Sequence, residues 1–182
     1  MKKILLLSIS LFASASMFAQ IYMAKTCEIS FFSASPLENI EAVNKACKPI
    51  INTATGDIQM KIAISAFQFE KPLMQEHFNE NYMETEKFPN AVFKGKINET
   101  IDWTKDGEYK VTVTGKLNIH GVEKDRTIDG VVKIKNGEVT LYSKFVIHIA
   151  DHNIQVPSLY VQNIAEDVAV TLNAAMEPYK KN

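Results

Sequence analysis

With 182 residues, 46% of them hydrophobic, the chain is long enough for one ordinary domain with a real core. Its 20 Lys and Arg residues face 21 Asp and Glu residues, and the basic residues do not cluster. The chain therefore has no basic patch of the kind that binds nucleic acid or an anionic membrane surface. We expect neither a nucleic-acid partner nor stable insertion into a membrane.

The first 19 residues have the layout of a cleavable secretory signal peptide. Lys2 and Lys3 form a basic start, residues 4–12 are apolar, and small side chains follow up to Ala19. The apolar run is shorter than the roughly 20 residues that span a bilayer. We therefore expect cleavage after Ala19, a periplasmic or secreted location, and one domain over residues 20–182. A retained N-terminal anchor is the alternative.

Two cysteines, Cys27 and Cys47, follow the expected cleavage site. In an oxidising compartment they would form a disulfide that closes a loop of about 20 residues, which contributes roughly 3 kcal/mol in the chain-entropy model. Two buried, unpaired thiols are the alternative. The spacing offers no further metal ligands.

Two segments have helical spacing. Residues 36–46 place Leu37, Ile40 and Val43 at helical intervals, after a Ser-Pro pair that favours a helix start. Residues 72–83 carry one apolar stripe among polar side chains, which predicts a short amphipathic helix that covers something apolar.

The remaining segments alternate between apolar and polar residues, as strands with one wet face do. Turn signals such as Asp106-Gly107 and Asn136-Gly137 separate them. We expect strands near residues 26–33, 48–53, 57–69, 91–101, 108–119, 126–135, 138–149 and 165–174. The sequence thus predicts an all-β fold, a single eight-stranded antiparallel barrel with one or two short helices. A two-sheet sandwich is the structural alternative.

The hairpin at Asn136-Gly137 has a register that can be stated residue by residue, because a two-residue loop fixes the pairing. Apolar residues then face apolar residues, and opposite charges face each other. The small pair Gly130 and Ser143 would either leave space in the interior or mark a bend or bulge. The expected pairs are Ile134–Val139, Val132–Leu141, Gly130–Ser143 and Ile128–Phe145 inside, with Lys135–Glu138 and Asp129–Lys144 outside.

The sequence contains no recognised catalytic pattern, neither a Ser elbow nor a phosphate-binding or dinucleotide-binding glycine motif. His148 and His152 would share one face of a helix, but the first is expected to end a strand and the second to lie in a loop. His120 falls at a turn, and His77 falls on or beside the apolar stripe of the second helix. We therefore expect no metal, no cofactor and no catalytic residue.

Several segments resemble the YceI family. These are residues 74–78 (Met-Gln-Glu-His-Phe), 88–95 (Phe-Pro-Asn-Ala-Val-Phe-Lys-Gly) and 115–122 (Gly-Lys-Leu-Asn-Ile-His-Gly-Val), with residues 29–33 and 156–158 in support. The resemblance implies a lipocalin-like barrel, periplasmic or secreted, with a long pocket for polyisoprenoid or similar amphiphilic chains. It carries over no catalytic residue.

Together these patterns predict a binding protein that catalyses nothing and holds an isoprenoid or other lipid-like chain. The ligand head group would lie near His77 or Asn81. The chain would be a monomer or a homodimer. One alternative is a filled barrel that acts through its surface, for example through Val131, Tyr142 and Val146; an enzyme for a lipid-like substrate is a weaker one. The expected ligand-binding residues are Phe31, Phe67, Phe69, Met74, His77, Phe78, Phe93, Val111, Val113, Leu117, Leu141 and Phe145.

Overall fold

The structure is a computed structural model that describes residues 20–34, 39–156 and 165–179. The predicted signal peptide, the first residues of the predicted 36–46 helix and most of the 156–158 motif lie outside these ranges. Ten strands form one sheet: β1 (Ile21–Ser33), β2 (Ile40–Asn44), β3 (Ile50–Asn52), β4 (Asp57–Ala63), β5 (Gln68–Phe69), β6 (Asn90–Ile97), β7 (Gly107–Ile119), β8 (Val122–Lys135), β9 (Glu138–His148) and β10 (Asp167–Pro178).

The sheet closes into a barrel because β10 pairs with β1. β2 and β3 both pair with β1 and together act as one interrupted strand. β4 pairs with β3 and β5 pairs with β2, so these two form a second interrupted strand, broken by the 3₁₀ turn η1 (Ile64–Ala66). The result is the predicted closed antiparallel barrel of eight strands. Closure leaves no long unpaired edge, which explains why a chain this rich in β-strand needs few helices.

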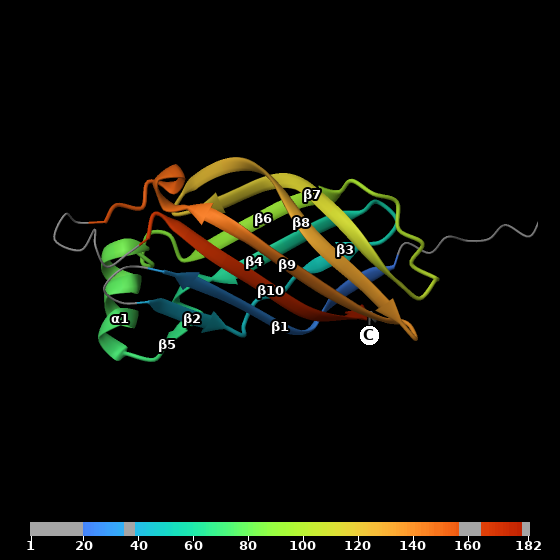
Figure 1. Cartoon of the computed structure of the whole chain (residues 1–182), viewed down its shortest axis with the longest axis horizontal. Helices are drawn as coiled ribbons and strands as arrows, with labels where there is room; N and C mark the ends of the chain where they lie inside the picture. Colours follow the sequence, from blue (N-terminus) through green and yellow to red (C-terminus); the bar gives the residue numbers. More distant parts are fainter. Residues whose placement is uncertain (1–19, 35–38, 157–164, 180–182) are drawn as a thin grey trace, which may run out of the picture.

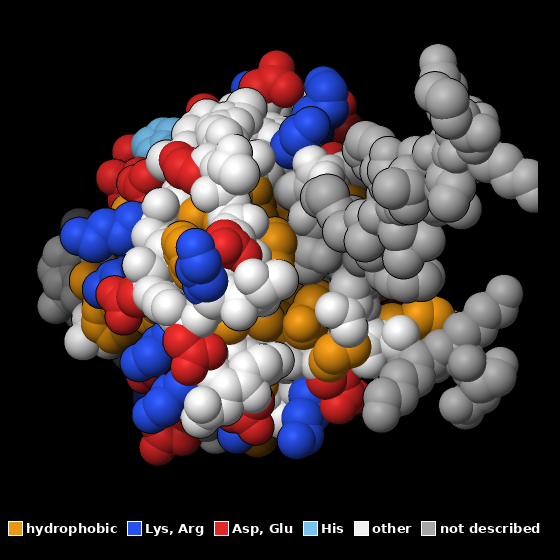
Figure 2. Space-filling model, turned by 90° about the vertical axis from the view of Figure 1, so that its right-hand side faces the viewer, with side chains coloured by type: hydrophobic (Ala, Val, Ile, Leu, Met, Phe, Trp, Pro, Cys, Tyr) orange, Lys and Arg blue, Asp and Glu red, His pale blue; other side chains and the backbone are white. Residues whose placement is uncertain are grey.

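A short helical cap lies at one end of the barrel (Figure 1). It consists of α1 (Pro72–His77), which continues into the π-helical turn η2 (Phe78–Tyr82), as the apolar stripe at 72–83 predicts. Pro72 begins α1, where its missing N–H costs nothing. A further 3₁₀ turn, η3 (Ile149–His152), follows β9. At the opposite end of the barrel, basic and acidic side chains are interspersed around an apolar area (Figure 2).

The predicted helix over residues 36–46 is wrong in its described part, because residues 40–44 form β2. Ala42 and Asn44 are both buried, at 1% and 0% exposure, and point inward with the two-residue period of a strand. β2 pairs with β1 on one side and with β5 on the other. The apolar spacing of this segment fits either structure, and these two neighbouring strands decide the outcome.

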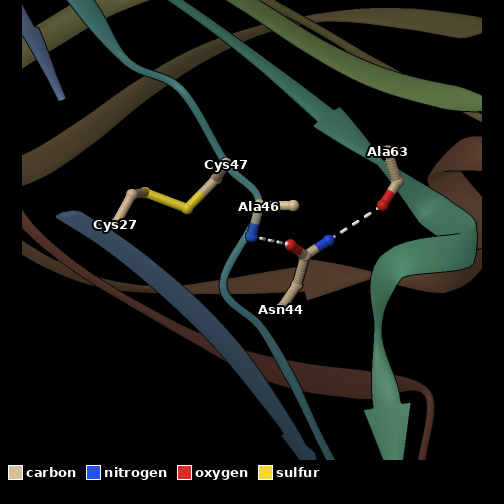
Figure 3. The surroundings of a disulfide bond; sticks show 5 residues. All are labelled: Cys27, Asn44, Ala46, Cys47 and Ala63. Carbon is tan, nitrogen blue, oxygen red and sulfur yellow. Dashed lines mark hydrogen bonds between the residues drawn. A yellow bond between two sulfur atoms is a disulfide. The ribbon is translucent and has the colours of Figure 1, made fainter. Parts of the chain in front are cut away.

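The interruption between β2 and β3 is held by a disulfide and one buried amide (Figure 3). The structure joins Cys27 and Cys47 with a Cα–Cα distance of 5.5 Å. Beside them, the Asn44 side chain accepts a hydrogen bond from the Ala46 backbone N–H and donates one to the Ala63 carbonyl, each at 2.8 Å. One side chain thus serves backbone groups at the break in each interrupted strand.

The β8–β9 hairpin has the predicted register from Lys135–Glu138 to Gly130–Ser143. Beyond this point the prediction is wrong, because the ladder ends there and the Ile128–Phe145 and Asp129–Lys144 pairs do not form. The Ser143 hydroxyl donates a 2.6 Å hydrogen bond to the Asp129 carbonyl. On their other sides, Phe145 still pairs with Val170 of β10, and Ile128 pairs with Val113 of β7.

Candidate ligand-binding cavity

A cavity of about 480 Å³ lies at the α1 end of the barrel. The inner faces of β1, β4, β6, β7, β9 and β10 form its wall, and α1 and η2 lie across it. Its described lining is apolar except for Ser33, Lys71, His77 and Tyr82. A concave, apolar site with few polar groups is typical of a pocket for a small hydrophobic or amphiphilic molecule.

Four phenylalanine rings form one side of this cavity. Phe31 from β1, Phe67 and Phe69 from the segment after β4, and Phe78 from η2 have ring centroids 5.0 to 5.8 Å apart in five pairs. This spacing is the preferred range for aromatic contacts. The rings therefore connect the helical cap to the barrel wall and give the cavity a preformed aromatic side.

Eight of the twelve predicted ligand-binding residues line the cavity. They come from β1, the β4–β5 region, the helical cap, β7 and β9. The eight are Phe31, Phe67, Phe69, Met74, His77, Phe78, Leu117 and Phe145.

The other four predicted residues, Phe93, Val111, Val113 and Leu141, do not line the cavity. Each is less than 10% exposed and packs in the core closer to the other end of the barrel. The sequence pattern identifies inward positions correctly, but it does not distinguish the empty half of a barrel from the filled half. Asn81, an expected head-group contact, is exposed and outside the lining.

Several lining residues were missed by the sequence analysis. Ile147 and Ile149 continue the two-residue alternation of Phe145, and Val168 and Val170 alternate in β10. The two-residue alternation that predicts an inward Phe145 would also have predicted these four residues. Ile154 lies in the loop after η3, where no period applies, so only the structure places it at the cavity.

A cluster of two histidines joins three segments at the same end of the barrel. The His120 Nε2 lies 3.1 Å from a Glu84 carboxylate oxygen, and its Nδ1 lies 3.3 Å from the His152 carbonyl oxygen. His152 is 1% exposed, and its Nδ1 lies 3.1 Å from the Val122 carbonyl oxygen. Burial holds the pKa of His152 below the ordinary value of 6.5, so the ring is neutral at pH 7.

The histidine cluster does not form a metal site. Among residues 20–34, 39–156 and 165–179, no group of three or more His, Cys, Asp or Glu side chains is placed to hold a metal ion. His148 lies apart from the cluster, with its Nδ1 2.9 Å from an Asp167 carboxylate oxygen. This hydrogen bond raises the pKa of His148. The hydrogen bonds of His120 and His152 join the loops at this end of the barrel.

The outward patch at Val131, Tyr142 and Val146 is partly formed. Val131 pairs directly with Tyr142 across β8 and β9. Tyr142 and Val146 are 45% and 48% exposed, which makes them two of the more exposed large apolar residues described. Separately, no helix in the described ranges is long and apolar enough to cross a membrane.

Comparison with known proteins supports the resemblance noted in the sequence. A family model described as the YceI-like domain matches residues 28–176. A comparison with curated proteins gives no match.

Solved structures with the same fold cover most of the chain. A polyisoprenoid-binding domain from Saccharophagus degradans, implicated in plant cell wall breakdown, has a TM-score of 0.74 at 15% identity, over 87% of this chain and 98% of that one. BcnA from Burkholderia cenocepacia has a TM-score of 0.69 at 20% identity, over 82% and 95%. The YceI protein of Campylobacter jejuni has a TM-score of 0.59 at 18% identity, over 81% and 90%. At these identities, the likeness shows the fold alone.

Proposed function

Because the chain belongs to the YceI-like domain family, we propose that it is an exported binding protein that catalyses no reaction. It holds a polyisoprenoid or similar amphiphilic chain in the cavity at the α1 end of the barrel. The observation that carries this proposal is the cavity itself, which has about 480 Å³ of space behind an almost entirely apolar lining.

The energetics of such a site favour a hydrocarbon chain. Each methylene group removed from water contributes about 0.8 kcal/mol. The aromatic cluster of Phe31, Phe67, Phe69 and Phe78 adds a polarisable surface, and Met74 adds an adaptable one. A ligand that fills this space gains burial along its whole chain while it uses few polar contacts.

The polar end of the ligand would lie near α1. Lys71, His77 and Tyr82 are the polar lining residues of the helical cap, while Ser33 ends β1. The Ser33 hydroxyl is already engaged, because it accepts a 2.9 Å hydrogen bond from the Ala165 N–H. His77, which is half-buried, is the residue we assign to the head group.

Export follows from the signal-like layout of residues 1–19. The family is typically periplasmic, and the Cys27–Cys47 disulfide suits an oxidising compartment. The mature chain would act there as a monomer or a homodimer, without a nucleic-acid partner.

A second candidate function is an interaction module that works through the outer surface. The observation in its favour is that the half of the barrel away from α1 is filled by buried side chains such as Val111, Val132 and Leu141. The patch of Val131, Tyr142 and Val146 would then be the docking surface.

Native mass spectrometry of the mature protein purified from its own compartment tests the main proposal, with organic extraction to identify any bound chain. We expect an added mass that matches an amphiphilic chain. Phe78→Asp should abolish this mass because it places a charge in the aromatic cluster. Phe32→Asp is the matched control, because Phe32 is 40% exposed on the neighbouring strand β1. If purified and ligand-supplemented protein both stay free of added mass, the surface function is favoured instead.

A further inference from the structure

The cavity ends partway along the barrel, although inward-facing residues continue to the far end. On β1 the lining residues are Ile29, Phe31 and Ser33, and the next inward residue, Cys27, is buried without lining the cavity. On β4, Ile62 lines the cavity and Met60 does not. On β6, Ala91 lines the cavity and Phe93 does not, and on β10 Val170 lines it and Leu172 does not.

The buried residues just beyond the lining form a floor on the side of β1, β4, β6 and β10. Met60 pairs directly with Phe93 across β4 and β6, so their side chains share the inner face. Leu172 on β10 is paired with Ile29 of β1, directly beside the lowest lining residue. The Cys27–Cys47 disulfide joins β1 to the segment between β2 and β3 beside them. The floor residues Cys27, Cys47, Met60, Phe93 and Leu172 are each 8% exposed or less.

Below the floor, none of the residues that the structure describes lines the cavity. Leu141 pairs with Ala174, the next inward residue after Leu172 on β10, so it lies one step deeper than Leu172. Near the far end, the Tyr22 and Trp103 rings stack at a centroid distance of 6.3 Å. A ligand chain therefore cannot pass from the helical cap to the far end without displacing packed side chains, which is costly in a close-packed core.

The length of the lined part of β1 gives the reach of the cavity. Four residue steps separate Ile29 from Ser33, and a strand rises about 3.3 Å per residue, so the lined wall is about 13 Å long. A fully extended polypeptide advances about 3.5 Å per residue, which is three main-chain bonds. One isoprene unit has four main-chain bonds, so it spans about 4.5 Å when extended. The lined wall therefore matches about three isoprene units.

We propose that the floor formed by Cys27, Cys47, Met60, Phe93 and Leu172 limits this protein to short amphiphilic chains of about three to four isoprene units, in contrast to long polyisoprenoids. This inference rests on the proposed binding function. A longer chain would leave its additional units in water at the mouth, and each methylene left there forfeits the gain from burial.

The test is chain-length selection from a membrane. Phosphatidylcholine vesicles carry equal amounts of farnesol, geranylgeraniol and the much longer solanesol. After incubation with the mature protein and removal of the vesicles, native mass spectrometry counts each bound alcohol. We expect farnesol and geranylgeraniol together to exceed solanesol at least about tenfold, which corresponds to about 1.4 kcal/mol. A smaller ratio overturns the chain-length limit and leaves the binding function standing. Uptake of none of the three overturns the binding function, and the limit with it.

Variants of the floor test which residues set the limit. Leu172→Ala removes side-chain volume directly below the cavity, and we expect it to raise the bound ratio of geranylgeraniol to farnesol at least about threefold. Leu141→Ala makes the same change one step deeper and should leave this ratio unchanged. If Leu172→Ala does not fold, Leu172→Val and Leu141→Val provide the same comparison with a smaller loss of volume. An equal ratio in the floor and control variants overturns the role of Leu172.

Discussion

Replacing Asn44 by alanine should destabilise the barrel more than its position in a short strand suggests. Asn44 is 0% exposed, and its amide bonds the Ala46 N–H and the Ala63 carbonyl at 2.8 Å each (Figure 3). Asn44→Ala leaves both backbone groups without that partner. Each buried group left unsatisfied costs about 1–3 kcal/mol. Both bonds are only partly buried, so water can replace some of the loss, and we expect a total of about 3 kcal/mol.

The measurement is urea unfolding followed by the fluorescence of Trp103, the only tryptophan of the chain. Because the free energy of unfolding falls by about 1–3 kcal/mol per molar urea, a loss of about 3 kcal/mol should lower the midpoint by roughly 1–3 M. Asn52→Ala is the matched control, because Asn52 accepts a similar hydrogen bond from the Ala54 N–H, at 3.0 Å, but at an exposed site. We expect it to cost at most about 0.5 kcal/mol. Equal midpoints for the two variants would refute the bridging role of Asn44.

Two further predictions concern the disulfide and pH. The double variant Cys27→Ser/Cys47→Ser should lose about 3 kcal/mol of unfolding free energy in the chain-entropy model, measured by the same urea titration, and wild type treated with reductant should match it. Burial lowers the pKa of His152, so the unfolded state takes up a proton near pH 6.5 that the folded state does not. The stability from neutral His152 is therefore complete above that pH and falls as the pH decreases. His148 acts in the opposite direction, because Asp167 raises its pKa and its contribution is lost as the pH rises. The test is thermal unfolding between pH 5 and 8, a range of about 3 units around the ordinary histidine pKa. In a His148→Gln background, His152→Asn should flatten the acid-side loss, and an unchanged slope would contradict the assignment.

The alternation of apolar and polar residues was sufficient to predict the barrel. It identified the inward positions of β7 and β9 and the register of the hairpin up to Gly130–Ser143. These features depend on neighbours along the chain or across one tight turn. A two-residue period and a two-residue loop are local properties, so a single sequence contains them.

The errors occur where distant residues compete for the same segment. The helical spacing in residues 40–44 is overridden because β1 and β5 are placed to pair with this segment. The β8–β9 ladder ends before Phe145, where the Ser143 hydroxyl donates to the Asp129 carbonyl. Asn44 is a polar residue in an apolar core, and its role depends on two breaks in the barrel wall that no local pattern predicts.

The sequence by itself determined that this protein is a β-barrel with a helical cap, an apolar interior and a resemblance to the YceI family. Only the tertiary structure decided which half of that interior is a cavity. Inward residues such as Phe93 and Phe145 look alike in the sequence, because each has a lysine on one side and a valine on the other. One packs in the floor and the other lines the cavity, since the closure of the barrel and the position of α1 set how much space surrounds each side chain.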